Sequence, residues 1–188
     1  MEAERVHLFD EIPRIEGEHV LLRPLRGTDA DALAEMVGNP KVYAHEPTFL
    51  FERQFEDMHE AIAQVYGTTF TERQSLILGI CVKGEEQICG LAEFYGLRQP
   101  AHKVSIGYRL LERYWGRGIA SETVALMLDY LFGRTDILLV TASTLPDNLG
   151  SARVLQKNGF VLHAQNSPED WGFEEDLPTD KWHLTKPA

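Results

Sequence analysis

The chain has 188 residues, 44% of them hydrophobic and 25% charged, which is the composition of a soluble globular protein. This length fits one domain with a substantial core, so residues 1–188 are expected to form a single domain. The 29 acidic and 18 basic side chains give a net charge of −11, which disfavours nucleic-acid binding because a basic surface must displace counterions. No apolar stretch approaches the roughly 20 residues that span a bilayer, so no membrane association is expected.

The N-terminal residues contain no basic segment followed by an apolar one, which favours the cytoplasm over secretion. The two cysteines, Cys81 and Cys89, lie inside apolar runs and are expected to be buried, reduced thiols. The seven histidines are scattered without a metal-binding spacing, so no metal ion is expected.

The N-terminal part predicts a strand followed by two helices. Residues 19–25 form an apolar run that ends at a proline, as strands often do. A helix is expected to begin at Thr28, which with Asp31 resembles a capping box, and to stop at Asn39-Pro40. Apolar residues at helical spacing predict a second, longer helix over residues 51–65.

The remaining elements alternate between strands and helices. Three β-type runs within residues 75–111 are separated by short joints and predict an antiparallel meander. A helix that opens near Gly118, a buried strand over 137–141 and a short helix over 149–158 follow. Two further strands are expected at 160–163 and 181–184. This order predicts an α/β fold in which helices cover a mixed sheet.

The segment before the long helix has the properties of an anion site. It runs from Arg113 to Gly118 and opens directly into the helix, whose first N–H groups and dipole favour negative charge. Gly116 and Gly118 allow a phosphate to approach closely, while Arg113 and Arg117 add cationic donors. The alternative is a strand-to-helix turn that needs glycine only for its backbone geometry.

Two nucleotide-binding motifs fit this segment less well. A Walker loop needs a lysine after its last glycine, and none follows Gly118. A Rossmann fingerprint needs an acidic residue at the end of the next strand, where this chain has Thr141-Ala142-Ser143.

Several motifs occur together along the chain. R-x-x-G-x-G-I-A follows GYRL, and Asn148-x-x-Ser151 and Asn158-Gly159-Phe160 come after it. EHVLLRPLRGTDADALAEMVGNPKV stands near the N-terminus. The combination resembles the GNAT superfamily of acyl-CoA-dependent acetyltransferases, and most closely its RimJ/RimL-type branch. The resemblance implies a GNAT-like mixed, mostly antiparallel sheet flanked by helices and splayed between its two central strands.

The resemblance also implies a site for acetyl-CoA. The pantetheine arm would pair with the backbone near Leu110 and Leu111, and the pyrophosphate would lie on the N–H groups from Arg113 through Ala120. The positions implied to bind this cosubstrate are Leu110, Leu111, Arg113, Gly116, Arg117, Gly118, Ile119, Ala120 and Asn148.

For the leaving group, the resemblance points to Ser151. In the RimJ/RimL-type branch the matching serine lies near the thioester sulfur, where it is able to protonate the departing thiolate. Many other family members use a tyrosine seven residues after the asparagine, but this chain has Leu155 there. An ordinary hydroxyl at a helix N-terminus is the alternative interpretation.

The acceptor amine must lose a proton before it attacks, and Glu93 is the candidate general base. It stands in the otherwise apolar run GLAEFYG, and because a buried unpaired carboxylate is costly, such a residue tends to face a cleft. A solvent-facing strand position is the alternative. Many RimJ/RimL-type sequences read E-I-G-Y where this chain has Ser105-Ile106-Gly107-Tyr108, so the usual strand glutamate is missing.

Acidic residues near the C-terminus suggest a cationic acceptor. Residues 169–176 carry acids and two aromatic residues, and if this segment borders the acceptor cleft it would attract an amine, with Trp171 and Glu174 as candidate contacts. A solvated acidic loop is the alternative. Glu46 occupies another segment that borders the acceptor site in the family.

These features predict an N-acetyltransferase that moves acetyl from acetyl-CoA to a primary amine, either a cationic small molecule or a protein N-terminus. Direct transfer in a ternary complex is expected because no cysteine or serine has an evident neighbouring base. One alternative is a non-catalytic acyl-CoA-binding sensor or protein-docking module. Another is a nucleotide-binding protein that uses only the Gly116–Gly118 turn.

Overall fold

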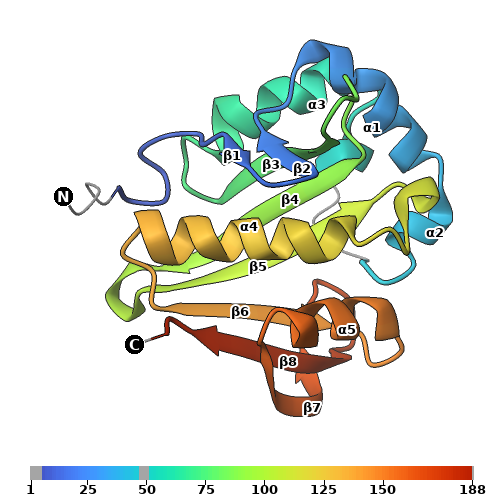
Figure 1. The fold of residues 1–188 in the computed structure, drawn as a ribbon. Helices are drawn as coiled ribbons and strands as arrows, with labels where there is room; N and C mark the ends of the chain where they lie inside the picture. Colours follow the sequence, from blue (N-terminus) through green and yellow to red (C-terminus); the bar gives the residue numbers. More distant parts are fainter. Residues whose placement is uncertain (1–5, 47–50, 188) are drawn as a thin grey trace.

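The computed structural model describes residues 6–46 and 51–187 (Figure 1). Eight strands form one sheet in the order β1-β2-β3-β4-β5-β6-β8-β7. Every neighbouring pair is antiparallel except β5 and β6, which are parallel. The strands are β1 (Ile15–Glu16), β2 (Val20–Arg23), β3 (Ser75–Val82), β4 (Gly90–Arg98), β5 (Lys103–Leu110), β6 (Leu139–Thr144), β7 (Val161–Glu169) and β8 (Leu177–Thr185).

Helices cover the sheet. The longest, α4, crosses its face and contacts β1, β2 and β5, and α5 packs beside it (Figure 1). α1 and α3 pack against each other near β2 and β3. The helices are α1 (Ala30–Val37), α2 (Pro40–Tyr43), α3 (Met58–Gln64), α4 (Ile119–Arg134) and α5 (Leu149–Lys157). Among the described residues, none of these helices is long and apolar enough to cross a membrane.

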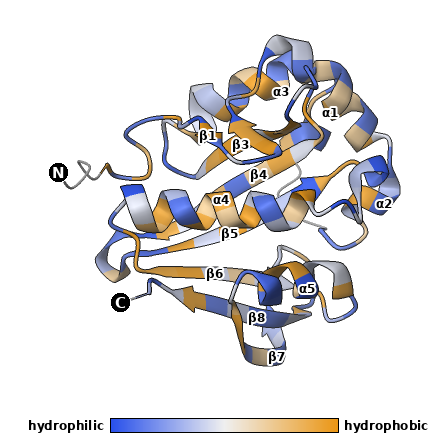
Figure 2. Cartoon of the chain, viewed as in Figure 1, coloured by the Kyte–Doolittle hydropathy of each residue, from blue (hydrophilic) through white to orange (hydrophobic). Residues whose placement is uncertain are grey.

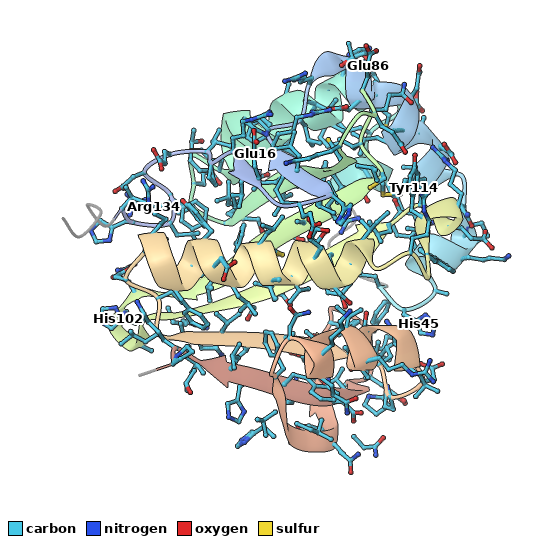
Figure 3. All side chains as sticks on the ribbon, in the orientation of Figure 1. Glu16, His45, Glu86, His102, Tyr114 and Arg134 are labelled. Carbon is cyan, nitrogen blue, oxygen red and sulfur yellow. The ribbon has the colours of Figure 1, made fainter. Side chains whose placement is uncertain are left out.

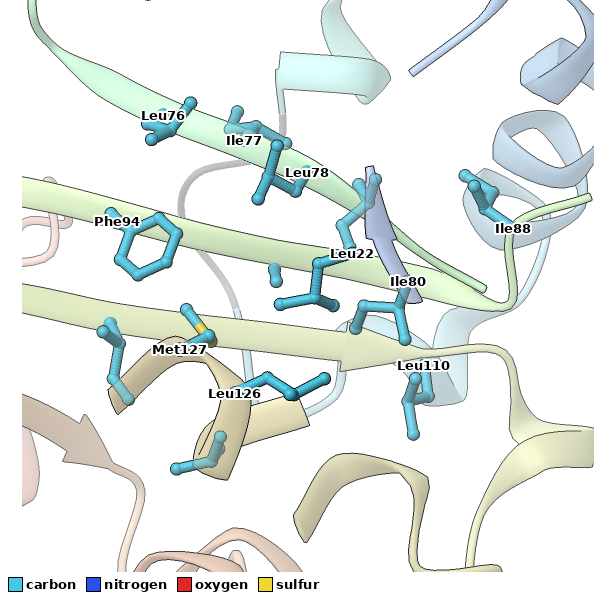
Figure 4. Packing of buried hydrophobic residues seen from close by; sticks show 14 of the residues in the cluster. Leu22, Leu76, Ile77, Leu78, Ile80, Ile88, Phe94, Leu110, Leu126 and Met127 are labelled. Atoms are coloured by element: carbon cyan, nitrogen blue, oxygen red, sulfur yellow. The ribbon is translucent and has the colours of Figure 1, made fainter. Parts of the chain in front are cut away.

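The core lies between the sheet and its helices, α1 and α3 as well as α4. Figure 4 shows Met127 of α4 close to the side chains of the central strands, and Met127, Leu22 and Ile80 are all fully buried. In Figure 2, β3 is hydrophobic along most of its length, whereas α4 alternates between hydrophobic and hydrophilic residues, as a helix with one buried face does. Cys81 and Cys89 are buried, free thiols, which confirms that expectation.

The predicted meander is confirmed as β3, β4 and β5. The helix expected to open near Gly118 is α4, and the short helix expected over 149–158 is α5. The strand expected at 137–141 is β6, which begins two residues later and continues to Thr144. The last two strands are longer than expected, because β7 and β8 pair along most of their lengths.

The capping box expected at Thr28 and Asp31 is wrong. A 3₁₀ turn over Gly27–Asp29 leads into the α-helix, which begins at Ala30, and the Asp29 carboxylate accepts from the N–H of Arg26, the N-cap of this turn, at 2.8 Å. Asp29 is fully buried and also accepts two hydrogen bonds of 2.8 Å from Arg23 on β2. The buried ion pair therefore ties the turn that precedes α1 to β2.

The single long helix expected over residues 51–65 is also wrong. A 3₁₀ turn occupies Phe51–Gln54, and α3 begins at Met58 with Asp57 as its N-cap, whose carboxylate accepts from the His59 N–H at 2.8 Å. A π-helical turn, Val65–Thr69, continues past the end of α3. The apolar residues of both pieces still contact the core, so their spacing predicted burial correctly but missed the break.

Candidate active site

A cleft opens where β5 and β6 separate. The two strands pair only from Lys103–Leu139 to Ser105–Thr141, and the hydroxyls of Ser105 and Thr141 lie 2.9 Å apart at the end of this pairing. Beyond that point β5 and β6 diverge (Figure 1). Residues of both strands line a cleft of about 910 Å³. Figure 3 shows His45 and Tyr114 at the open end of the molecule and His102 at the opposite end.

The backbone of β5 faces this cleft at Leu110. The Leu111 N–H donates to the Cys89 carbonyl at 2.9 Å, so the peptide groups of Leu110 point the other way, toward the cleft. The Leu110 carbonyl accepts from the indole N–H of Trp115 at 2.8 Å. Leu110 lines the cleft, whereas Leu111 does not, and the Leu111 carbonyl accepts from the Tyr114 N–H.

The start of α4 forms one end of the cleft. Gly116 and Gly118 have φ values of 70° and 82°, and a methyl group added at either would have nothing within 4 Å. No side chain among the described residues caps the helix, and the first helical bond runs from the Glu122 N–H to the Gly118 carbonyl. The N–H groups of Ile119 and Ala120 precede that bond and lie at the cleft, so this end is suited to an anion.

The two arginines of the loop lie in different places. Arg117 lines the cleft, with its guanidinium carbon 5.1 Å from the centre of the Tyr114 ring. Arg113 pairs with Glu35 of α1 and lies outside the cleft lining. The loop is therefore anchored to the N-terminal helices through one arginine, while the other is available to the cleft.

Asn148 and Ser151 lie at the start of α5, on the other wall. The side-chain carbonyl of Asn148 accepts from the Ser151 N–H at 3.1 Å, so Asn148 caps the helix. The Ser151 hydroxyl accepts from the Tyr108 hydroxyl at 3.2 Å, and this bond joins β5 to α5 across the cleft. Tyr108 was not identified from the sequence, although it stands in the GYRL motif. Leu155 is buried.

A buried group of charges lies beside Glu46 in the wall of the cleft. Arg109 of β5 donates to both carboxylate oxygens of Glu52, at 2.9 and 3.0 Å, and Glu52 also accepts from the Tyr43 hydroxyl at 2.8 Å. Glu46 accepts a longer bond, 3.4 Å, from Arg109. Sequence reasoning missed Arg109 and Glu52. An arginine within a buried strand was the available signal, because such a charge needs a partner.

Glu93 and Glu46 both line the cleft. Glu93 is 3% exposed, and its Oε1 has no hydrogen-bond partner among the described residues. Burial raises the pKa of Glu93, while Arg109 opposes the shift. Burial also raises the pKa of Glu46, to about 7, with Arg109 opposing and Glu93 adding to the shift. These two carboxyls are therefore harder to ionise than ordinary glutamates.

The C-terminal acidic segment contributes in part. Trp171 lines the cleft, whereas Glu174 is exposed and lies outside its lining. Glu169 lines the cleft but pairs with Lys181 at 2.5 Å. No group of three or more potential metal ligands occurs in residues 6–46 and 51–187.

The sheet that splays between β5 and β6, with a glycine loop and an uncapped helix at the opening, is the arrangement that the GNAT resemblance implied. The model of the acetyltransferase (GNAT) domain matches residues 19–161, which is more than half of the chain. The protein belongs to this family of acetyltransferases.

Individual relatives agree with this assignment. The N-acetyltransferase p20 of Bacillus licheniformis is 30% identical over 145 residues, covering 76% of this chain and 79% of the relative. YoaA, an N-acetyltransferase of Bacillus subtilis, is 26% identical over 150 residues, covering 79% and 82%. The structure of Mycobacterium smegmatis RimJ in complex with CoA-disulfide superimposes with a TM-score of 0.80 at 19% identity, covering 96% of this chain and 90% of RimJ. The fold is thus that of the RimJ/RimL-type branch.

Proposed function

We propose that the chain, as one domain over residues 1–188, transfers the acetyl group of acetyl-CoA directly to a primary amine. The observation that carries the proposal is one cleft with a helix start suited to an anion at one end and two carboxyl groups, those of Glu46 and Glu93, at the other. Such a cleft suits a phosphate-bearing donor and a cationic acceptor that meet at the point where β5 leaves β6.

The donor end fits coenzyme A. The open space at Gly116 and Gly118, with the N–H groups of Ile119 and Ala120, suits the pyrophosphate, and Arg117 adds positive charge. The peptide groups of Leu110 that face the cleft suit the amides of the pantetheine arm. The backbone N–H and carbonyl of Leu111 are already hydrogen-bonded to Cys89 and Tyr114, so its role is to hold β5 in place. Asn148 fixes the start of α5 beside this arm.

Ser151 is the proposed acid for the leaving group. When bound, acetyl-CoA supplies a thioester whose sulfur leaves as a thiolate, and a hydroxyl beside it lowers the cost of departure. Ser151 lines the cleft and is held both by its backbone bond to Asn148 and by the Tyr108 hydroxyl. The first contact fixes the backbone of Ser151, and the second occupies an acceptor position of its oxygen, so the hydroxyl proton remains available to the sulfur.

The acceptor is proposed to be a cationic amine that enters past Trp171. This indole lines the cleft and offers an aromatic face to an ammonium group. A carboxylate at this end takes the proton that the amine must lose, and Glu93 is the residue predicted for this step from the sequence. Glu174 acts from the surface by attraction alone, because it lies outside the cleft lining.

Thermal unfolding with acetyl-CoA, ATP or NADH tests the donor site. At about 100 times its dissociation constant, a ligand adds roughly 2.7 kcal/mol, which raises the midpoint of a domain of this size by roughly 5–10 °C. We expect this rise with acetyl-CoA alone. Release of free thiol on adding an amine then separates an enzyme from an acyl-CoA-binding sensor, which would show the rise without the thiol. A rise with ATP or NADH alone would refute the proposal.

A further inference from the structure

Two carboxylates meet at the acceptor end of the cleft, and they differ in depth. Glu46, in the segment after α2, keeps 25% of its side chain exposed, whereas Glu93 on β4 is 3% exposed. A methyl group at Gly107 of β5 would lie 3.8 Å from Glu46 Oε1, and Gly107 is the cross-strand partner of Glu93. Both carboxylates therefore lie over the same part of β5, just past the point where it leaves β6.

The nearby guanidinium of Arg109 is shared among several carboxyl groups and bonds most closely to Glu52. Arg109 donates two hydrogen bonds to Glu52, which is fully buried. Glu52 also accepts a hydrogen bond from the Tyr43 hydroxyl. This buried pair is electrically neutral by itself. The bond from Arg109 to Glu46 is longer, at 3.4 Å. Two neighbouring carboxyl groups in a buried position repel each other when both are charged, so ionising the second costs more free energy than ionising the first.

We propose that Glu46 accepts the proton of the acceptor ammonium, while Glu93 stays protonated beside it. The inference rests on the proposed acetyl transfer and names its base. Glu93 is more stable as a neutral group because it is buried and its Oε1 lacks a partner among the described residues. Glu46 has access to water, so it is able to release the proton to the solvent after each turnover.

The titration of the two groups agrees with this geometry. Burial raises the pKa of both, and it raises that of Glu46 to about 7, so a large fraction of Glu46 is ionised at neutral pH. The charged and titratable groups that face Glu46 from the surrounding elements are Tyr43, Glu52, Glu93, Tyr95, Tyr108 and Arg109.

The proton balance of the step is simple. One proton passes from the ammonium nitrogen to Glu46, and the freed electron pair forms the C–N bond as the C–S bond breaks. The second proton of that nitrogen reaches the departing sulfur through the Ser151 hydroxyl, which gives one proton and receives one. The products are the amide, the free thiol and one proton on Glu46, which the solvent removes.

The test compares pH profiles of kcat/KM, measured by thiol release with a primary amine whose own pKa is near 10. Because the base must be ionised, the unaltered protein should gain activity as the pH rises through about 7. Glu46→Gln should lower kcat by at least about 100-fold and abolish this rising limb of the pH profile. Glu46→Asp should restore the limb with a lower kcat. Glu93→Gln should keep the limb, and Glu60→Gln, on an exposed face of α3, should match the unaltered protein.

Three results decide the inference. A limb that survives in Glu46→Gln and disappears in Glu93→Gln would assign the base to Glu93 and overturn it. A limb that survives in both variants would overturn it as well. Each variant must still show the thermal shift with acetyl-CoA, which confirms that it folds and binds the donor. If the unaltered protein releases no thiol with any amine, the proposed function itself fails, which is a different outcome from a misassigned base.

Discussion

Replacing Gly118 by alanine separates the two roles that a glycine has at the start of α4. The residue has φ 82°, where an L side chain costs about 1–2 kcal/mol, and a methyl group there would meet nothing within 4 Å. The loss of stability should therefore come from the backbone alone. For a domain of this size the unfolding midpoint should fall by roughly 2–8 °C.

The same methyl group would occupy the space proposed for the pyrophosphate. Losing one hydrogen bond to a charged group costs about 1.5–3 kcal/mol, which corresponds to a roughly 10- to 100-fold higher KM for acetyl-CoA. Titration of acetyl-CoA in the thiol-release assay measures this increase. The KM for the amine should change much less, because the acceptor end of the cleft is separate from α4.

Gly84 provides the matched control. It has φ 92° and equally open surroundings, but it lies in the turn between β3 and β4, away from the cleft lining. Gly84→Ala should cost similar stability, measured by urea unfolding, and leave the KM for acetyl-CoA unchanged. Equal KM values in the Gly118 and Gly84 variants would show that Gly118 serves only the backbone, and the phosphate-binding argument would be wrong.

Three further predictions concern other parts of the molecule. Tyr108→Phe removes only the hydroxyl that contacts Ser151, so kcat should fall several-fold at constant KM for acetyl-CoA; an unchanged kcat would remove Tyr108 from the mechanism. Asp29→Ala leaves Arg23 buried without its carboxylate partner and should lower the free energy of unfolding, measured in urea, by about 3–5 kcal/mol. A loss below about 1 kcal/mol would contradict this reasoning. Neutralising the three exposed acids at 174–176 should raise the KM for a cationic amine in low salt, and 1 M salt, where the Debye length is about 3 Å, should erase the difference.

Local patterns alone determined much of the fold. Alternating and continuous apolar runs with short joints identified the meander of β3, β4 and β5, because such strands are adjacent in both sequence and space. The glycine loop before α4 was equally readable, since the positive φ values of Gly116 and Gly118 and the helix that follows are properties of a few consecutive residues. The donor end of the cleft is therefore largely a local feature.

The acceptor end depends on contacts between distant residues, and only the tertiary structure decided it. Arg109 meets Glu52 from 57 positions away, and this pair leaves Glu46 and Glu93 to compete for one proton. The same holds for Tyr108, which contacts Ser151 across the cleft from 43 positions away. Burial and charge neutralisation are properties of the packed chain, so a strand glutamate such as Glu93 looks like a base in sequence, whereas its depth and its neighbours favour the neutral form.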